Sequence, residues 1–491
     1  MNSTLNSKLI QIFSVIGDCI IVILSVAAAF FVSGIYTDFY DSVLKYSSLF
    51  LALIIFNFIM LELYSPKAEN VYNALISVGI SLIISYVCVY AASITIGFRY
   101  QPVTFWGHLF IFLFGAMLVW RTAVAIAKKK IGEKRTLLII ENMNNTSRLA
   151  RKLKYASNEE NRSWYHLLDE NDENEIRIIT DELIEKFDAV FISPHISRKT
   201  ASKILYKVLS LGKDANILAN VDGITTLKGK IYQIDDTPVI IKKGIHLSKF
   251  QKFIKRGLDI VLSLILGIVT LPAFLLCAIA IKLDSKGPVF YKQERYTIHK
   301  KIFNVYKFRT MVEDAEKDGA RFASEDDPRI TKVGRTLRAL RLDELPQIYN
   351  ILFGSMSFVG PRPERPIFAD EFSKIIDSYD MRYCLKAGLT GYAQVYGRYN
   401  TRVSDKILMD IIYGTTYSFL LDIKIILLTA KIMFMKSATA GVDEELDVSL
   451  SSAEKESERR NSALSFIRSN SEPENREEEK NEENINNYSG V

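Results

Sequence analysis

The sequence has 491 residues, is 48% hydrophobic and carries a formal net charge of +6. Its length allows several domains. The four cysteines and five histidines are scattered. This spacing argues against a disulfide framework, a histidine-ligated metal site or a serine–histidine triad, and we expect buried free thiols.

The charge is unevenly distributed along the chain. Residues 442–491 hold fourteen acidic and six basic residues, so the remainder has a surplus of fourteen positive charges. Such a surplus suits anionic lipid, nucleotide or phosphate partners. No aromatic–basic RNA motif is present, so we expect no nucleic acid partner.

Four apolar segments come first, and each is long enough to cross a bilayer core of about 30 Å. They are Ile10–Ile35, Tyr46–Leu63, Ala74–Ile96 and Phe105–Ala127. The basic residues that follow the fourth segment place the N-terminus and everything after Lys128 in the cytoplasm. We expect Asp18 to pack between helices, and Glu62 and Arg121 to reach the membrane interface. The charge-poor spans argue against a pump or channel.

The next region alternates between strand and helix patterns, which predicts a doubly wound parallel sheet. We expect strands at 135–140, 165–168, 176–180, 189–193 and 216–220, and helices at 146–153, 181–187 and 197–210. The first strand–helix loop, ENMNNTS, has no glycine, whereas a dinucleotide requires close backbone approach there. We therefore predict a Rossmann-like module without a cofactor, followed by a connector over residues 227–247.

A fifth apolar run, residues 260–281, has Pro272 in its middle. Proline removes a helix hydrogen bond and bends the axis. Basic residues flank both ends, so neither end prefers the far side of the membrane. A bent, re-entrant helix that returns to the cytoplasmic face satisfies both observations. The alternative is an ordinary fifth span, which would place Asp343 outside the cell.

The adjacent carboxylates Asp343 and Glu344 form the most informative pair in the chain. Apolar residues at helical spacing follow them, with Pro346 in the first turn and Gly354 as a stop. This places Asp343 near a helix N-cap, where free amides and the dipole suit phosphate. Simple capping is the alternative. The surrounding arginines favour a functional site: Arg329, Arg335, Arg338, Arg341, Arg362 and Arg365.

The remaining patterns predict a mixture of strands and helices. We expect strands within 287–311, helices at 313–318, 332–342, 372–383 and 403–421, and a glycine-broken loop at 386–400. Residues 423–434 are too short to span, so they lie on the membrane surface or pack in the core. The acidic tail cannot bury enough apolar area to fold.

Six ordered sequence blocks in the C-terminal half resemble the bacterial polyprenyl-phosphate sugar-1-phosphate transferase family. They are KRGLDIVLS, GPVFYKQERYT, FNVYKFRTM, DPRIT-KVGR, LDELPQIYNIL-G-MSFVGPRPE and AGLTGYAQV-GR. The front half is similar in architecture to the larger members, which add four spans and a Rossmann-like domain. Together, the residue patterns and the resemblance predict a membrane α-helical bundle (1–130), an α/β Rossmann-like domain (131–247), an α/β monotopic catalytic domain with a re-entrant membrane helix (248–441) and, from its composition, a disordered acidic tail (442–491).

The resemblance also implies a reaction at the cytoplasmic face of the bacterial inner membrane. A UDP-hexose would transfer hexose-1-phosphate to undecaprenyl phosphate and release UMP, initiating capsule, exopolysaccharide or O-antigen assembly. Asp343 would be the nucleophile that forms a covalent intermediate, and Glu344 would help to hold Mg²⁺. Arg362, between Pro361 and Pro363, would contact donor phosphate. Further basic positions of the site would be Lys307, Arg309 and Arg338. Smaller members break the membrane helix at Ser-Pro, where this chain has Leu271-Pro272.

Three alternatives remain open from the sequence. A glycosyltransferase would release UDP, a non-catalytic scaffold for polysaccharide assembly would have no need of Asp343, Glu344 and Arg362, and a transporter would need charged spans. The N-terminal half has no catalytic motif, so we hypothesise that it serves assembly, with a homodimer as one outcome.

Overall fold

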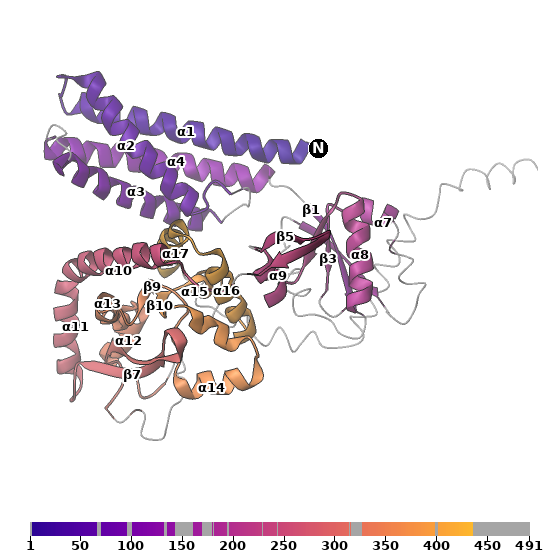
Figure 1. The fold of residues 1–491 in the computed structure, drawn as a ribbon. Coiled ribbons are helices and arrows are strands. Elements are labelled where there is room, and N and C mark those ends of the chain that lie inside the picture. The colour runs from indigo at the N-terminus through magenta and orange to yellow at the C-terminus, as the bar shows by residue number, and fades with distance from the viewer. Residues whose placement is uncertain are drawn as a thin grey trace, which may run out of the picture.

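The computed structural model describes residues 2–435, with gaps at 66–69, 96–100, 132–134, 143–160, 169–178, 180, 194–195, 228, 243, 314, 316–326 and 398–400. It contains an N-terminal helical bundle, a small α/β unit and a larger C-terminal α/β unit (Figure 1). The predicted helix at 146–153 and the acidic tail lie outside the described residues, as does most of the helix predicted at 313–318.

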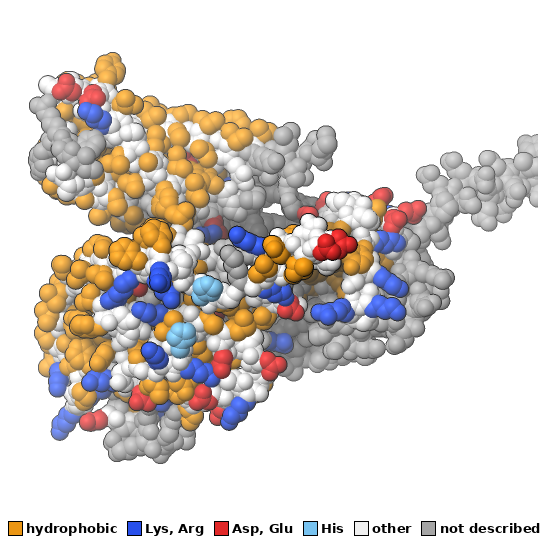
Figure 2. Space-filling view, viewed as in Figure 1, with side chains coloured by type: hydrophobic (Ala, Val, Ile, Leu, Met, Phe, Trp, Pro, Cys, Tyr) orange, Lys and Arg blue, Asp and Glu red, His pale blue; other side chains and the backbone are white. Residues whose placement is uncertain are grey.

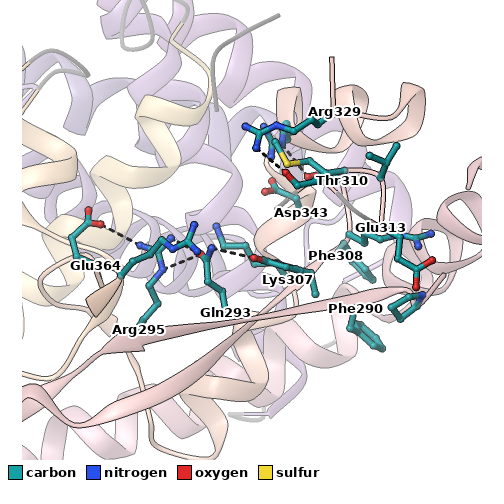
Figure 3. Close-up of a pocket in the computed structure, with 18 of the residues that line it drawn as sticks. Phe290, Gln293, Arg295, Lys307, Phe308, Thr310, Glu313, Arg329, Asp343 and Glu364 are labelled. Carbon is teal, nitrogen blue, oxygen red and sulfur yellow. Dashed lines mark hydrogen bonds and ion pairs between the residues drawn. The ribbon is translucent and has the colours of Figure 1, made fainter. Parts of the chain in front are cut away.

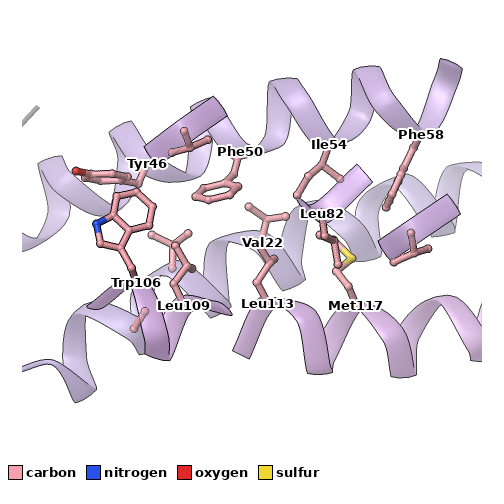
Figure 4. Close-up of a cluster of buried hydrophobic side chains, with 14 of the residues drawn as sticks. Val22, Tyr46, Phe50, Ile54, Phe58, Leu82, Trp106, Leu109, Leu113 and Met117 are labelled. Atoms are coloured by element: carbon pink, nitrogen blue, oxygen red, sulfur yellow. The ribbon is translucent and has the colours of Figure 1, made fainter. Parts of the chain in front are cut away.

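In the described part of the chain, the N-terminal bundle consists of four helices that are long and apolar enough to cross a membrane. They are α1 (Asn2–Val32), α2 (Phe39–Met60), α3 (Val71–Thr95) and α4 (Val103–Ile131). Their inward faces interdigitate aromatic and aliphatic side chains, including Phe50, Leu109 and Met117 (Figure 4). The four predicted apolar segments are therefore confirmed as helices.

One ion pair lies inside this bundle. Asp18 on α1 is buried, and it accepts hydrogen bonds from Arg121, from the Tyr64 hydroxyl at 2.7 Å and from Trp120 Nε1 at 3.1 Å. The prediction that Asp18 packs between helices is confirmed. The prediction that Arg121 reaches the interface is wrong, because this side chain is only 2% exposed and pairs with the buried carboxylate. The thiol prediction also fails for Cys88, which is exposed.

The small α/β unit contains a parallel four-stranded sheet in the order β2-β1-β3-β4. Its elements are β1 (Arg135–Asn142), β2 (Asn161–Leu168), α7 (Asp181–Glu185), β3 (Ala189–Ile192), α8 (Arg198–Ser210) and β4 (Asp214–Ile217). Ser197 caps α8 by accepting from the backbone amide of Thr200. The strand predicted at 176–180 falls outside the described residues, apart from Ile179.

The region predicted to be a connector is structured. Helix α9 (Val221–Thr226) precedes an antiparallel hairpin of β5 (Lys230–Ile234) and β6 (Thr237–Ile241). Asp235 turns the hairpin with a positive φ of 56°, a conformation that Asp tolerates better than most residues. Ile224 of α9 is buried in the core of the C-terminal unit, so this segment joins the two α/β units.

The fifth apolar run forms two helices, α10 (Lys249–Val269) and α11 (Leu271–Asp284), bent by 61°. Ser248 and Gln251 form a capping box that begins α10. Pro272 lies in the first turn of α11, where its missing amide breaks no helical hydrogen bond. The predicted break at Pro272 is confirmed. Many large apolar side chains of both helices are exposed, with Ile268 at 75%.

The C-terminal unit is built on two small sheets and short helices. The hairpin pairs β7 (Phe290–Tyr296) with β8 (Ile302–Phe308) through η1 (Ile298–Lys300), and β9 (Ser357–Val359) pairs in parallel with β10 (Gly388–Thr390). The helices are α12 (Lys332–Ala339), η2 (Leu342–Glu344), α13 (Gln347–Leu352), α14 (Pro366–Ile375), η3 (Tyr379–Cys384), α15 (Tyr392–Tyr396), α16 (Val403–Thr416) and α17 (Phe419–Met433).

Three predictions for this unit need correction. The helix expected at 372–383 is two elements, α14 and η3, because Pro366 starts α14 earlier. The glycine-broken loop contains β10 and α15. The helix expected at 403–421 is also divided, because α16 ends at Thr416 and α17 begins at Phe419. The stretch at 423–434 belongs to α17, whose Ile425 is fully buried, so of its two predicted placements the structure shows packing in the core.

Helix α17 lies between the bundle and the C-terminal unit (Figure 1). Leu427 and Leu428 pack with Leu61 of the bundle. Lys424 pairs with Glu62 at 2.7 Å, and Tyr396 donates to the same carboxylate at 3.2 Å. One helix therefore contributes to the core of the C-terminal unit and to a separate apolar cluster that it shares with the bundle.

Candidate active site

The carboxylate pair lies in a tight turn, η2, directly before α13. Arg341 precedes it in the left-handed region with φ 54°. The N-cap of α13 is Pro346, so Asp343 lies near the start of this helix, as predicted, but not at the cap, and capping does not account for the pair. Proline has no amide to offer, and α13 has only six residues. The nearby cations, rather than a helix dipole, supply the positive field.

Glu344 is held by two cations on its Oε1 atom. Lys307 Nζ from β8 lies at 3.0 Å, and Arg362 Nη2 from the loop after β9 lies at 2.8 Å. Burial alone would raise the pKa of Glu344, but Arg362 and Lys307 outweigh burial and hold that pKa well below its usual range. Glu344 is therefore a stable anion.

Asp343 experiences the opposite balance. Burial, and next the negative charge of Glu344, raise the pKa of Asp343 above its usual range, against the charges of Lys307 and Arg338. Two adjacent carboxylates with pKa values pushed apart carry different chemical roles more often than the same one.

Asp343 lines a cavity of about 300 Å³ in which cations predominate (Figure 3). Basic side chains that line it are Arg295, Lys307, Arg309, Arg329, Arg338 and Arg365. Phe290 and Phe308 provide an apolar wall. A cavity of this composition suits a ligand that carries phosphate and an apolar or ring-shaped part.

The other predicted basic residues differ in their contacts. Arg309 reaches the carbonyls of Ser285 and Lys286, so its guanidinium ties β8 to the end of α11. Arg338 Nε donates to Thr310 Oγ1 at 3.0 Å. These two arginines shape the cavity wall, whereas Lys307 contacts the carboxylate of Glu344.

The loop that carries Arg362 is anchored behind the site. Pro361 is buried, Pro363 is half-buried, and Arg362 is exposed. Arg382 Nη2 donates to the carbonyl of Arg362 at 3.0 Å and pairs with the buried Asp410 at 3.0 Å. This contact fixes the backbone from which Arg362 reaches Glu344.

Sequence reasoning overlooked a second polar group in the cavity. Arg295 donates to Gln293 Oε1, to the Pro363 carbonyl at 3.1 Å and to Glu364 at 3.2 Å (Figure 3). The strand pattern of YKQERY could have indicated this group. Gln293 and Arg295 are two residues apart in a strand, so their side chains lie on the same face of β7.

A glycine fixes the position of Arg338. An added Cβ at Gly334 in α12 would lie 2.1 Å from the Thr310 carbonyl oxygen. This oxygen belongs to the backbone, so it cannot move aside without displacing the chain around it. We predict that Gly334→Ala destabilises the chain by about 1–3 kcal/mol through overpacking, measured by thermal unfolding. Gly257→Ala is the matched control, because no atom lies within 4 Å of its added Cβ. Equal stability of the two variants would contradict this close contact.

The residues present fit a magnesium ion shared with a ligand. No group of three potential metal-binding side chains occurs among the described residues. Mg²⁺ is commonly held by one or two carboxylates together with substrate phosphates. Both ion pairs of Glu344 use Oε1, so Oε2 remains for a cation beside Asp343.

The fold and site define a membrane-associated α/β domain with an adjacent carboxylate pair, of which Asp343 lines a cavity rich in cations. Comparisons with known proteins agree with this class. A family profile described as bacterial sugar transferase matches residues 250–436. A Bacillus subtilis putative undecaprenyl-phosphate N-acetylgalactosaminyl 1-phosphate transferase is 46% identical over 129 residues, 26% of this chain and 72% of the relative. The chain belongs to the bacterial sugar transferase family.

Two longer relatives match more of the chain. A UDP-glucose:undecaprenyl-phosphate glucose-1-phosphate transferase from Klebsiella pneumoniae is 36% identical over 249 residues, covering 49% of this chain and 53% of the relative. A UDP-N-acetylgalactosamine-undecaprenyl-phosphate N-acetylgalactosaminephosphotransferase from Aeromonas hydrophila is 41% identical over 187 residues, covering 38% and 44%. The matches therefore span about half the length of these relatives.

Proposed function

We propose that this protein transfers hexose-1-phosphate from a UDP-hexose to undecaprenyl phosphate and releases UMP. The observation that carries the proposal is the carboxylate pair: Glu344 is held as an anion by Lys307 and Arg362, while Asp343 faces a cavity lined by arginines. The names of the relatives, which act on UDP-glucose or UDP-N-acetylgalactosamine, support the substrate class.

The proposed chemistry has two displacements. A carboxylate oxygen of Asp343 attacks the phosphorus that bears the sugar, and the bridging oxygen leaves with UMP. A phosphate oxygen of undecaprenyl phosphate then attacks the same phosphorus, and the Asp343 carboxylate is released. Arg362 and the cations of the cavity offset the charge of the diphosphate. Mg²⁺ held by Glu344 would neutralise phosphate oxygens when bound.

The fold supports a location of the catalytic unit at the membrane surface, where the lipid acceptor lies. We infer that α10 and α11 form a re-entrant membrane helix, because a 61° bend and exposed apolar side chains suit a helix that returns to the face it entered. The catalytic unit would lie on the cytoplasmic side of the bacterial inner membrane, where UDP-sugars are found. The four-stranded parallel sheet would be a Rossmann-like module without a cofactor, and assembly as a homodimer would be a role for the N-terminal half.

The test is the identity of the released nucleotide. The full chain in detergent is incubated with undecaprenyl phosphate, Mg²⁺ and a panel of UDP-hexoses. UMP release from one donor would support the proposal and identify the sugar. UDP release would indicate a glycosyltransferase, and no release from any donor would favour the scaffold alternative.

The acid limb of the pH–rate profile should depend on Glu344. Because Asp343 attacks as an anion, activity falls as the pH drops through its raised pKa. Glu344→Gln removes a like charge, which lowers the pKa of Asp343 and moves the acid limb of the residual kcat to lower pH. The exposed Glu371→Gln is the control. An unchanged acid limb in Glu344→Gln would contradict electrostatic coupling of the pair.

A further inference from the structure

A second cationic cavity lies in the C-terminal unit, where α10 begins. Its volume is about 410 Å³, and none of its lining residues also lines the cavity around Asp343. Six basic side chains line it: His246, Lys252, Lys255, Arg256, His299 and Lys386. The proposed reaction uses none of them.

Two of these cations already have partners. Lys255 pairs with Asp422 at 2.7 Å, and Arg256 donates to the Ile351 and Leu352 carbonyls. The cavity also contains one carboxylate, Asp259, which accepts hydrogen bonds from Ser357 Oγ at 3.0 Å and from the backbone amide of Phe358 at 2.9 Å. These contacts leave the positive charge in excess.

Lys386 and Lys252 supply that excess. Lys386 is half-buried, and within the described part of the chain its ammonium has neither a hydrogen bond nor an ion pair. Burial, together with Arg256 and Lys255, lowers the pKa of Lys386, and Asp259 opposes this only in part. Lys252 is exposed at the cavity mouth. An anion between these lysines would relieve the repulsion.

The position of the cavity indicates where that anion comes from. Phe250 and Phe253, on the first turns of α10, are 73% and 75% exposed and flank Lys252. Aromatic and basic side chains mixed at the start of an apolar helix are typical of the headgroup region of a membrane. Figure 2 shows lysine, arginine and histidine side chains gathered beside the orange apolar band of α10.

We propose that this cavity binds the phosphate of an anionic phospholipid, with Lys386 and Lys252 as its principal contacts. The acyl chains would lie along the exposed apolar side chains of α10. The acceptor lipid is a less suitable occupant, because its phosphate has to reach Asp343 in the other cavity. Lipid binding in this cavity is separate from the proposed transfer reaction and does not depend on catalysis.

Native mass spectrometry of the full chain in detergent tests the proposal. The protein is titrated with phosphatidylglycerol, phosphatidylcholine or undecaprenyl phosphate, and lipid adducts are counted. We compare wild type with Lys252→Gln/Lys386→Gln. The control, Lys230→Gln/Lys374→Gln, removes two exposed lysines outside the cavity. Thermal unfolding checks that both variants are folded.

The expected result is a phosphatidylglycerol adduct on wild type and on the control, weakened roughly 10- to 30-fold in Lys252→Gln/Lys386→Gln. Equal retention of phosphatidylcholine would overturn the proposal, and so would equal weakening in the control. Competition by undecaprenyl phosphate at the same stoichiometry would reassign the cavity to the acceptor lipid. Displacement of the adduct by soluble glycerol phosphate at similar concentration would show that the lipid tail contributes nothing, which also contradicts the proposal.

Discussion

Asp343→Asn is expected to abolish both product formation and exchange of UMP into the UDP-hexose, by at least about 10⁴-fold. The scale is that of removing a nucleophile in covalent catalysis. Exchange needs only the first displacement, so it reports on the proposed intermediate without the acceptor lipid. The measurement is incorporation of labelled UMP into the donor.

The variant should remain folded. A carboxyl whose pKa is raised on folding contributes stability below its unfolded pKa, and that contribution is lost as the pH rises through the folded value. At neutral pH the uncharged amide of the Asp343→Asn variant therefore destabilises the folded state no more than the ionised carboxylate of Asp343 does. The Tm of the variant should be no lower than that of wild type. Asp377→Asn, at an exposed site on the loop after α14, is the control and should keep its activity. Persistent exchange in Asp343→Asn would remove the covalent role.

Asp422→Ala should have the largest effect on stability. Asp422 on α17 accepts from Lys255 of α10 and from the hydroxyl of Tyr413 on α16, both at 2.7 Å, and it is fully buried. Truncation leaves the Lys255 ammonium buried without its carboxylate. Breaking such a pair costs about 3–5 kcal/mol. For a unit of this size, that corresponds to a Tm lowered by roughly 6–20 °C.

A second variant separates lost charge pairing from lost packing. The double variant Lys255→Met/Asp422→Leu removes both charges and keeps the side-chain volume. It should therefore recover more than half of the stability that Asp422→Ala loses. Thermal unfolding of the full chain in detergent checks both variants, with Asp377→Ala as the exposed control. A loss in the double variant as large as that in Asp422→Ala would show that packing, rather than the unpaired ammonium, dominates.

The sequence predicted those elements whose signal is local. Long apolar runs gave the four N-terminal helices, and a proline in a fifth run gave the break before α11, because backbone chemistry decides both. The hairpin at Asp235 and the boundaries of α14 were not predicted. They depend on turn conformation and on tertiary packing, which periodicity does not report. The burial of Arg121 was also missed, since its carboxylate partner lies in another helix.

The candidate site shows the same division. Adjacency in the chain identified Asp343 and Glu344, and the resemblance pointed to Lys307 and Arg362. Lys307 and Arg362 both contact Oε1 of Glu344 because the fold brings together β8, η2 and the loop after β9, which are far apart in sequence. No local pattern distinguishes Lys307, which contacts Glu344, from Arg309, which binds carbonyls at the end of α11.

The shared role of α17 has a consequence for biosynthesis. The patch on α2 and α3 that α17 covers, which includes Met60, Leu61 and Ile80, is made long before Phe419 leaves the ribosome. At about 5–20 residues per second, the interval is on the order of 20 to 70 s. During that time the insertion machinery, neighbouring lipid or a chaperone contacts this patch of α2 and α3. In the finished protein the same patch is covered by α17, which has not yet been translated.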